Sequence, residues 1–328
     1  MNTTAEKVRE ERIASYLTPA GYEHMLDIIL RRTLGAAPHI VAIGEIYLDA
    51  LDKAEKNGVK TPDAIEMIRD ITDYFIDVRG NICYAVTLAM RIITKDMEAY
   101  ADQPLFAFRA FLKERVEGYH AMNRGWLDTI RDYGWEVIKD YDSILLYDYS
   151  SCINAMMETA RAHGKTLTVY VPESRSLNGG YHFAKNAMPL EQNVIFLPDN
   201  AILYGVVKAD ACFIGAESIY PDGSTCNTVG SDLVAILCDY FKKPFYVATS
   251  MIKYDERGLK GYTQPPHWKY LRERLSAGWD KELSERTCFT CPNLSVVKPS
   301  LITEYITERG VLPPSAIYVE GTNFMNSI

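Results

Sequence analysis

Five short apolar runs in the C-terminal half of the chain, each followed by a polar turn and a helical stretch, limit its fold most strongly. None of these runs alternates polar and apolar residues, which is typical of strands covered on both faces. Alternation of strands and helices predicts a parallel, doubly wound, Rossmann-like sheet. The runs are SILLYD, TLTVYV, NVIFLP, ACFIG and PFYVAT, and the helical stretches cover 151–163, 179–188, 199–207 and 227–242.

The part of the chain before about residue 138 has the periodicity of helices instead. The stretch GYEHMLDIIL places apolar residues at i, i+3, i+4, i+7 and i+8, and similar stretches continue to residue 137. The sequence therefore predicts an α/β protein with a helical N-terminal domain, 1–138, and a Rossmann-like ligand-binding domain, 139–328.

Charge and composition argue against several classes of partner. The net charge is −8 and no block of Lys and Arg stands out, so no nucleic-acid partner is expected. The chain has no window of 18 apolar residues, and MNTTAEKVREERIA lacks the apolar core of a signal peptide. Seven scattered cysteines, an odd number within apolar runs, indicate reduced thiols. We therefore expect a cytoplasmic protein without a membrane partner.

Open parallel sheets bind ligands beyond the C-terminal ends of their strands, so these ends hold the candidate site. Arg175 carries a planar fork suited to phosphate, and Gly179 and Gly180 precede a helix whose free amides can hold an anion. An ordinary surface arginine in a loop is the alternative. Lys253 is suited either to a phosphate or to a carboxylate partner.

Glu217 follows a strand at the same edge of the predicted sheet. A carboxyl group there can act as general acid or base if burial raises its pKa, or it can serve as an ion-pair partner or helix cap. Asp199 and Asn200 open the next helix, and a capping role is the default for Asp199.

Cys288 and Cys291 form a CxxC pair without a second Cys or His pair nearby. A single pair is a weak signal for zinc, so we predict no metal site. The sequence also contains none of the GxSxG, GxxxxGK[ST] or GxGxxG motifs, and no cofactor is predicted.

Three segments in this order resemble one superfamily. They are VYVPESRSLNGG, the block from ADACFIGAESIYPDGSTCNTVG to PFYVATSMIKYD, and NLSVVKPSLITEYITERGVLPPSAIY. The superfamily comprises the initiation factor 2B α/β/δ subunits, the methylthioribose-1-phosphate isomerases and the archaeal ribose-1,5-bisphosphate isomerases. The resemblance covers about 140 to 318, and it implies a homodimer or larger homo-oligomer that binds a phosphorylated sugar or nucleotide.

The resemblance also implies roles for individual residues. Arg175 matches an arginine that contacts the substrate phosphate, Asp199 and Asn200 fall on a segment that lines the pocket, and Asn227 matches the asparagine of NK(I/V)GT. Arg79, in VRGNICYAVTLAM, corresponds more loosely to an arginine of the N-terminal domain.

Three positions depart from the isomerase pattern. Tyr149 stands where the isomerases have a catalytic cysteine, Glu217 where they have an aspartate, and Thr228 where they have a lysine.

Two functions follow from this comparison. The first is a divergent aldose-1-phosphate to ketose-1-phosphate isomerase, with Glu217 as acid/base and Tyr149 or Asp148 as its partner. The second is a non-catalytic subunit like those of initiation factor 2B, which binds a sugar phosphate or nucleotide as a regulatory or assembly protein.

Overall fold

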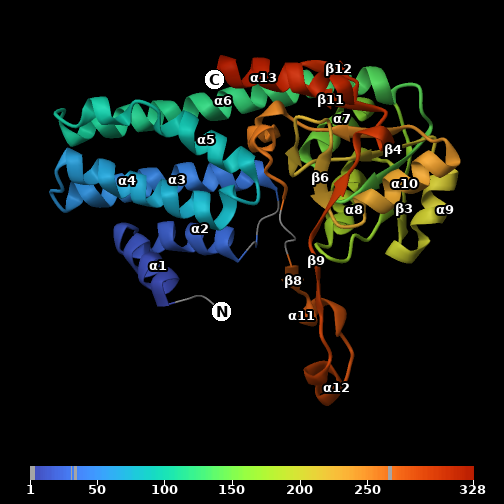
Figure 1. Ribbon diagram of the computed structural model, residues 1–328, viewed down its shortest axis with the longest axis horizontal. Coiled ribbons are helices and arrows are strands. Elements are labelled where there is room, and N and C mark those ends of the chain that lie inside the picture. Colours follow the sequence, from blue (N-terminus) through green and yellow to red (C-terminus); the bar gives the residue numbers. More distant parts are fainter. Residues whose placement is uncertain (1–3, 31, 33–34, 265–267) are drawn as a thin grey trace. The chain divides into compact units, whose positions relative to one another are not determined.

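A computed structural model describes residues 4–30, 32, 35–264 and 268–328 (Figure 1). The chain divides into two compact units, residues 1–125 together with 328, and residues 126–327. The division falls inside helix α6 (Leu105–Ile138), and the predicted domain boundary at residue 138 coincides with the end of that helix.

The described part of the N-terminal unit is built from helices. Helix α3 is central to it, because its buried residues include Ile43, Ile46 and Tyr47 and it packs against α2, α4 and α5. The elements are α1 (Thr4–Tyr16), α2 (Pro19–Ile29), α3 (Ala36–Lys56), α4 (Thr61–Phe75), a π-helical turn η1 (Ile76–Gly80), α5 (Tyr84–Thr94), a 3₁₀ turn η2 (Met97–Tyr100) and the first part of α6.

The C-terminal unit contains a seven-stranded sheet with the order β12-β11-β7-β4-β1-β2-β3. All neighbouring strands are parallel except β12, which pairs antiparallel with β11. The predicted doubly wound fold is therefore confirmed. The strands are β1 (Ser143–Tyr147), β2 (Thr168–Pro172), β3 (Asn193–Leu197), β4 (Ala211–Ile214), β7 (Phe245–Ala248), β11 (Glu304–Thr307) and β12 (Gly310–Leu312).

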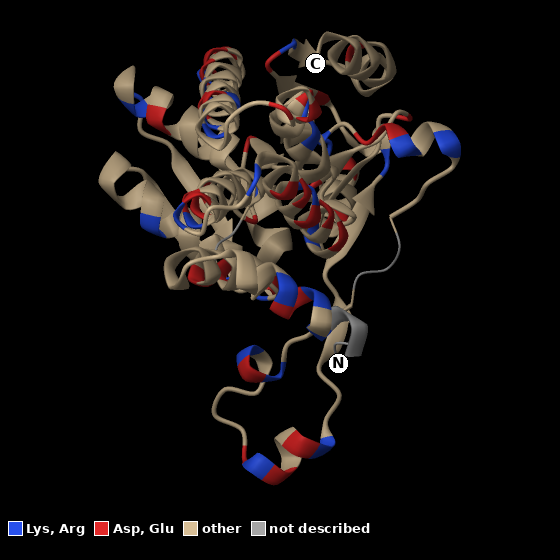
Figure 2. Ribbon diagram, turned by 90° about the vertical axis from the view of Figure 1, so that its left-hand side faces the viewer, with Lys and Arg blue, Asp and Glu red and all other residues tan. Residues whose placement is uncertain are grey.

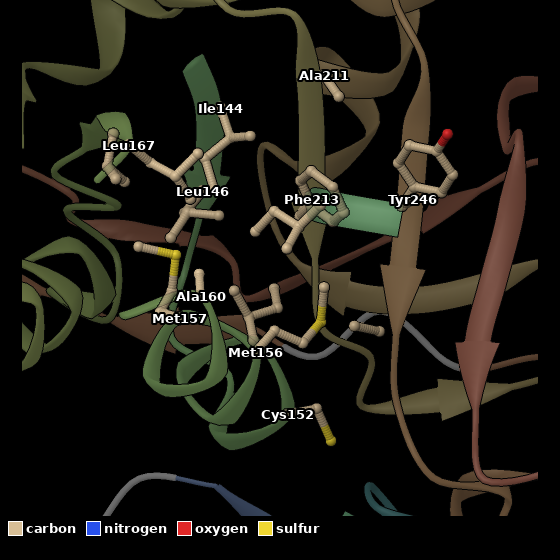
Figure 3. Packing of buried hydrophobic residues seen from close by; sticks show 14 of the residues in the cluster. Ile144, Leu146, Cys152, Met156, Met157, Ala160, Leu167, Ala211, Phe213 and Tyr246 are labelled. Atoms are coloured by element: carbon tan, nitrogen blue, oxygen red, sulfur yellow. The ribbon is translucent and has the colours of Figure 1, made fainter. Parts of the chain in front are cut away.

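Helices cover both faces of this sheet. On one face α7 (Ser151–Ala162) and α8 (Gly179–Ala187) pack with the end of α6 over a cluster that includes Leu146, Met156 and Phe213 (Figure 3). We call this cluster the α7-side core. On the other face lie α9 (Ile202–Lys208) and α10 (Ser231–Phe241), which pack against each other.

One predicted helix begins later than expected. The helix predicted over 227–242 starts at Ser231, because β6 (Thr225–Thr228) pairs antiparallel with β10 (Leu294–Val297) and with β5 (Ser218–Ile219). Backbone hydrogen bonds to two partner strands replace those that a helix would have formed.

The remaining elements of the C-terminal unit are short, apart from the last helix. An arm extends from the sheet domain and contains the two-stranded pair of β8 and β9 (Figure 1). These elements are η3 (Met188–Leu190), η4 (Asp199–Ala201), η5 (Met251–Lys253), η6 (Glu256–Lys260), β8 (Trp268–Tyr270), α11 (Arg272–Leu275), α12 (Lys281–Arg286), β9 (Thr290–Pro292), η7 (Pro299–Leu301), η8 (Pro314–Ala316) and α13 (Ile317–Ser327).

Charged residues of both signs are interspersed along the helices, without a long run of one sign (Figure 2). Within the described residues, none of the helices combines the length and the apolar character that a membrane span requires.

Candidate functional site

The order of the strands places a candidate site between β1 and β4. The chain runs outward from β1 to β2 and β3 in one direction, and from β4 to β7 and β11 in the other. In doubly wound sheets, ligands bind at this switch point, beyond the C-terminal ends of the strands. The residues that follow β1 begin with Asp148, and those that follow β4 lead to Glu217.

Asp148 is a buried carboxylate at this point. Its backbone is left-handed, with φ of 57°, and Gly179 approaches it so closely that a Cβ at Gly179 would lie 1.9 Å from its Oδ1. Thr228 Oγ1 donates to Asp148 Oδ2 at 2.6 Å, and Ser174 Oγ donates to Oδ1 at 3.4 Å. The side chain is thus held by hydroxyl groups from two other segments.

The electrostatics of Asp148 are those of a group that can exchange protons near neutral pH. Its pKa is raised to about 6, mainly by burial and also by the charge of Glu217, although hydrogen bonds from Thr228, the Tyr149 amide and Ser174 act in the opposite direction. Burial disfavours the charged form of a carboxyl group, and a second carboxylate nearby adds to that cost. The structure therefore brings together Asp148 and Glu217, two of the three predicted catalytic residues.

Glu217 is half-buried and its position is fixed by the backbone. Its amide donates to the Cys226 carbonyl at 2.8 Å, at the start of the hairpin formed by β5 and β6. Lys253, from the turn after β7, donates to the carbonyl of Ala216, the residue before Glu217. A cation and two carboxyl groups therefore gather at the ends of β1, β4 and β7.

The loop that follows β2 is held by Asp199. Its two carboxylate oxygens accept from the amides of Ser174 at 2.8 Å and Arg175 at 2.9 Å, so Asp199 orders this loop instead of taking the capping role expected from the sequence. Arg175 is about half exposed and lies 3.7 Å from Glu173, which leaves its guanidinium accessible to an anion. Asn200 is exposed beside Asp199.

The two glycines of this loop serve close packing. Besides the contact of Gly179 with Asp148, a Cβ at Gly180 would lie 2.2 Å from the Pro172 carbonyl oxygen. The Gly180 amide donates to the Glu173 carbonyl at 3.2 Å. Both glycines thus allow α8 to begin directly against the ends of β1 and β2.

Tyr149 and Asn227 have partners outside the pair of carboxylates. The Tyr149 hydroxyl accepts from Asn186 at 3.2 Å, and its ring lies against Phe183 of α8, with centroids 5.3 Å apart. The structure therefore places Tyr149 on the α8 side, whereas Asp148 turns toward Thr228. Asn227 is buried in β6 and donates to Ser231 Oγ at 3.0 Å.

Arg79 belongs to the N-terminal unit. It lies buried in the π-helical turn η1 and donates from Nε to His39 Nδ1 of α3 at 3.0 Å. A π-helical turn is a local irregularity that often accompanies function.

Two residues at the site escaped the sequence analysis. Ser174 lies within the segment PESRSLNGG but carries no catalytic pattern of its own, and its contact with Asp148 depends on the fold. Glu308 follows β11, a short strand that the search for apolar runs did not find; the only signal was its place in the segment ITERG.

Cys288 is exposed and Cys291 is half-buried, both in the arm and both as free thiols. Among the described residues, no three His, Cys, Asp or Glu side chains are grouped so that they could hold a metal ion.

Fold and site together define a Rossmann-like protein with a helical N-terminal unit and, at the switch point of its sheet, a buried and a half-buried carboxyl group. A family model described as the Initiation factor 2 subunit family matches residues 34–314, and the chain belongs to this family.

Its relatives include proteins of two kinds. It is 30% identical to translation initiation factor eIF2B subunit alpha of Dictyostelium discoideum, over 70% of this chain and 72% of the relative. It is 25% identical to ribose 1,5-bisphosphate isomerase of Methanocaldococcus jannaschii, over 62% of this chain and 66% of the relative.

The fold has a close counterpart among solved structures. The 5-methylthioribose 1-phosphate isomerase of Pyrococcus horikoshii matches with a TM-score of 0.75 and 21% identity, over 91% of this chain and 86% of the other. This similarity supports the fold.

Proposed function

We propose that the chain is a sugar-phosphate isomerase that converts an aldose 1-phosphate to the ketose 1-phosphate, with Asp148 and Glu217 as its acid/base pair. The family includes ribose 1,5-bisphosphate isomerases, which supports this class of substrate. The observation that carries the proposal is the position of the buried Asp148 carboxyl group at the switch point, near enough to Glu217 for the two charges to interact. Burial raises the pKa of Asp148 to about 6, and a carboxyl group with a raised pKa is suited to act as a general acid.

The chemistry requires proton transfers at four atoms, and these balance. One group protonates the ring oxygen as its bond to C1 breaks, and later takes a proton back from the C2 hydroxyl as this becomes the ketone. Another group removes the proton from C2 and returns it to C1. Asp148 is protonated over a larger part of the pH range than an ordinary aspartate, so it is assigned the acid role. Glu217 is assigned the role of the base. Tyr149 remains a candidate partner, with its hydroxyl bound to Asn186.

Arg175 is assigned to the phosphate. Its guanidinium can bind a phosphate with two parallel hydrogen bonds, and Asp199 fixes the backbone that carries it. Asn200, Asn227, Lys253 and Arg79 remain proposed contacts of the ligand.

A non-catalytic ligand-binding subunit is the competing function. The relative with the highest identity given above is an initiation factor subunit, and the oxygens of Asp148 are already engaged by Thr228 and Ser174. In this case the site would bind a sugar phosphate or nucleotide without converting it.

The two functions are separated by Glu217→Gln. The purified protein is screened for thermal stabilisation by ribose 1,5-bisphosphate, other sugar 1-phosphates and nucleoside monophosphates, and the ligands that bind are tested for isomerisation. A ligand at a hundredfold excess over its Kd stabilises by about 2.7 kcal/mol. We expect Glu217→Gln to lower turnover by about 100-fold or more while the ligand still binds, since general acid/base catalysis contributes roughly that much.

Arg175→Ala is expected to remove most of the stabilisation by the ligand, and Arg161→Ala, a surface arginine paired with Glu191, is its matched control. A wild-type protein that binds a sugar phosphate and never converts it would contradict the isomerase and favour the binding subunit.

We also propose that the protein forms a homodimer or larger homo-oligomer through α9 and α10. The described face of these two helices exposes a group of large apolar side chains: Leu203, Tyr204, Val207, Leu233, Ile236 and Tyr240. Contiguous apolar surface of this kind is typical of an interface between protein chains. Ile236→Asp should shift the mass measured by light scattering toward the monomer, and an unchanged mass would contradict this interface.

A further inference from the structure

The turn after β7 is held by a carboxylate from the neighbouring strand. Glu308 follows β11, and its Oε1 and Oε2 accept from the Met251 amide at 3.0 and 3.1 Å. Ser250 Oγ donates to Oε1 at 3.1 Å. Since these donors open the 3₁₀ turn η5, Glu308 fixes the start of that turn.

The other end of the same turn carries Lys253. The Lys253 amide donates to the Ser250 carbonyl at 3.1 Å, and its ammonium donates to the carbonyl of Ala216. A continuous series of hydrogen bonds therefore leads from Glu308 through the turn to the peptide that precedes Glu217. A lysine ammonium has three donors, so Lys253 in this position keeps donors for an anionic ligand.

The surroundings of Glu308 are polar but sheltered. Its pKa is raised to about 6 by burial, although hydrogen bonds from the Met251 amide and Ser250 and the charge of Arg309 act in the opposite direction. Arg309 itself lies 3.8 Å from Glu320.

The Cys152 thiol of α7 also lies near this turn. Burial raises the pKa of the thiol, and the charges of Lys253 and Glu308 both affect it. The Cys152 sulfur points away from the other labelled side chains of the α7-side core (Figure 3).

We propose that Glu308 is a positioning residue, which holds the turn from Ser250 to Lys253 and thereby keeps the Lys253 ammonium against the peptide before Glu217. The geometric part of this inference is independent of the proposed function. The role of Lys253 as a cation for the phosphorylated ligand rests on it. Without Glu308, the Met251 amide at the start of the turn loses its acceptor, and the backbone of Lys253 is no longer held in one position.

The position of Lys253 can be measured by amine labelling of the full-length protein at pH 7.5, followed by mass spectrometry. Glu308→Ala should raise the labelling rate of Lys253 about fivefold or more, because the ammonium leaves its carbonyl partner for solvent. Glu308→Gln should restore most of the protection, since its amide oxygen still accepts from the Met251 amide. The exposed Lys242 serves as internal reference.

The matched control is Glu304→Gln, at the start of the strand β11 that Glu308 follows, which should leave the labelling of Lys253 unchanged. An unchanged labelling rate in Glu308→Ala would overturn the proposal. If Glu308→Ala does not fold, Glu308→Asp carries the test, because it keeps the charge but withdraws the carboxylate from the turn. Labelling of that variant at the wild-type rate would equally overturn it.

Ligand affinity separates this inference from the proposed function. With ribose 1,5-bisphosphate as probe in calorimetry, Glu308→Ala should weaken binding about tenfold and Glu308→Gln much less. Faster labelling of Lys253 with undiminished affinity would overturn the ligand role of Lys253. A wild-type protein that binds no sugar phosphate would contradict the proposed function, while the labelling experiment would still decide the role of Glu308.

Discussion

The α7-side core and the C-terminal ends of the strands belong to the same sheet, but buried side chains are apolar in the first and polar in the second. The core is built of apolar side chains without solvent exposure, such as Leu146, Met156 and Phe213. At the strand ends, Asp148 and Ser174 are also buried, yet both are polar and have a left-handed backbone, with φ of 57° and 47°. Strain and buried charge cost stability, so they persist where the surrounding structure enforces them, which is common at functional sites.

This difference predicts that removing the native side chain lowers stability in the core, whereas removing the charge at the strand ends raises it. Phe213 is fully buried and stacks on Tyr246, with ring centroids 5.0 Å apart. Phe213→Ala should cost about 3–5 kcal/mol of unfolding free energy, since it removes buried surface and leaves a cavity. Urea unfolding followed by near-ultraviolet circular dichroism measures this loss; a cost below about 1 kcal/mol would mean that the site is not close-packed.

Asp148→Asn should instead stabilise the protein at neutral pH. The folded pKa of about 6 lies above the ordinary value of 3.8, so the folded protein binds a proton more tightly than the unfolded chain. Stability therefore falls as pH rises from about 4 to about 6 and is level above that. The shift of about two units corresponds to at most about 3 kcal/mol. Thermal unfolding should show a higher Tm for Asp148→Asn at pH 7.5 but not at pH 4.

Asp210 provides the control of opposite sign. Although burial acts in the other direction, hydrogen bonds from the Ser143 side chain and from the amides of Ser143 and Asp142 lower its pKa. The ionised Asp210 therefore contributes to the stability of the fold at neutral pH, and this contribution is lost as the pH falls through the pKa of the folded protein. Asp210→Asn should lose stability at pH 7.5. If Asp148→Asn instead lowered the Tm equally at pH 7.5 and pH 4, the proposed cost of ionising Asp148 in the folded protein would be contradicted.

The smallest expected effect concerns Tyr149, which borders both regions. Tyr149→Phe removes a half-buried hydroxyl bound to Asn186 and should cost about 1 kcal/mol of stability. If Asp148 and Glu217 are the acid/base pair, turnover should stay within about threefold of wild type. A loss of turnover by two orders of magnitude would make Tyr149 the partner of Glu217 instead.

The sequence predicted the parallel strands of the sheet better than the shorter strands and the helix boundaries. The five strands came from apolar runs that are long enough to stand out, and their order in the chain implied the doubly wound sheet. Strands β11 and β12 escaped because each contains only two consecutive apolar residues, Tyr305 with Ile306 and Val311 with Leu312. The predicted helix over 227–242 wrongly included residues 227–230, because only pairing with β10, far along the chain, makes Asn227 and Thr228 part of strand β6.

The candidate site shows the same limit. Polar residues at the strand ends were found because parallel sheets bind ligands there. Their partners were not, since Ser174, Thr228 and Glu308 meet Asp148 and the β7 turn only through the fold. Neighbouring residues on a chain also point in different directions, and the choice between Asp148 and Tyr149 depends on backbone geometry that no local pattern reports.

The central claim is that the buried carboxyl group of Asp148 and the half-buried one of Glu217 interact electrostatically at the switch point. Nuclear magnetic resonance of protein with ¹³C-labelled aspartate carboxyl groups, assigned with Asp148→Asn, measures the titration of Asp148 directly. The account predicts a midpoint near pH 6 in the wild type, and a lower midpoint in Glu217→Gln because the repelling charge is gone. A wild-type midpoint near pH 4, unchanged in Glu217→Gln, would contradict it.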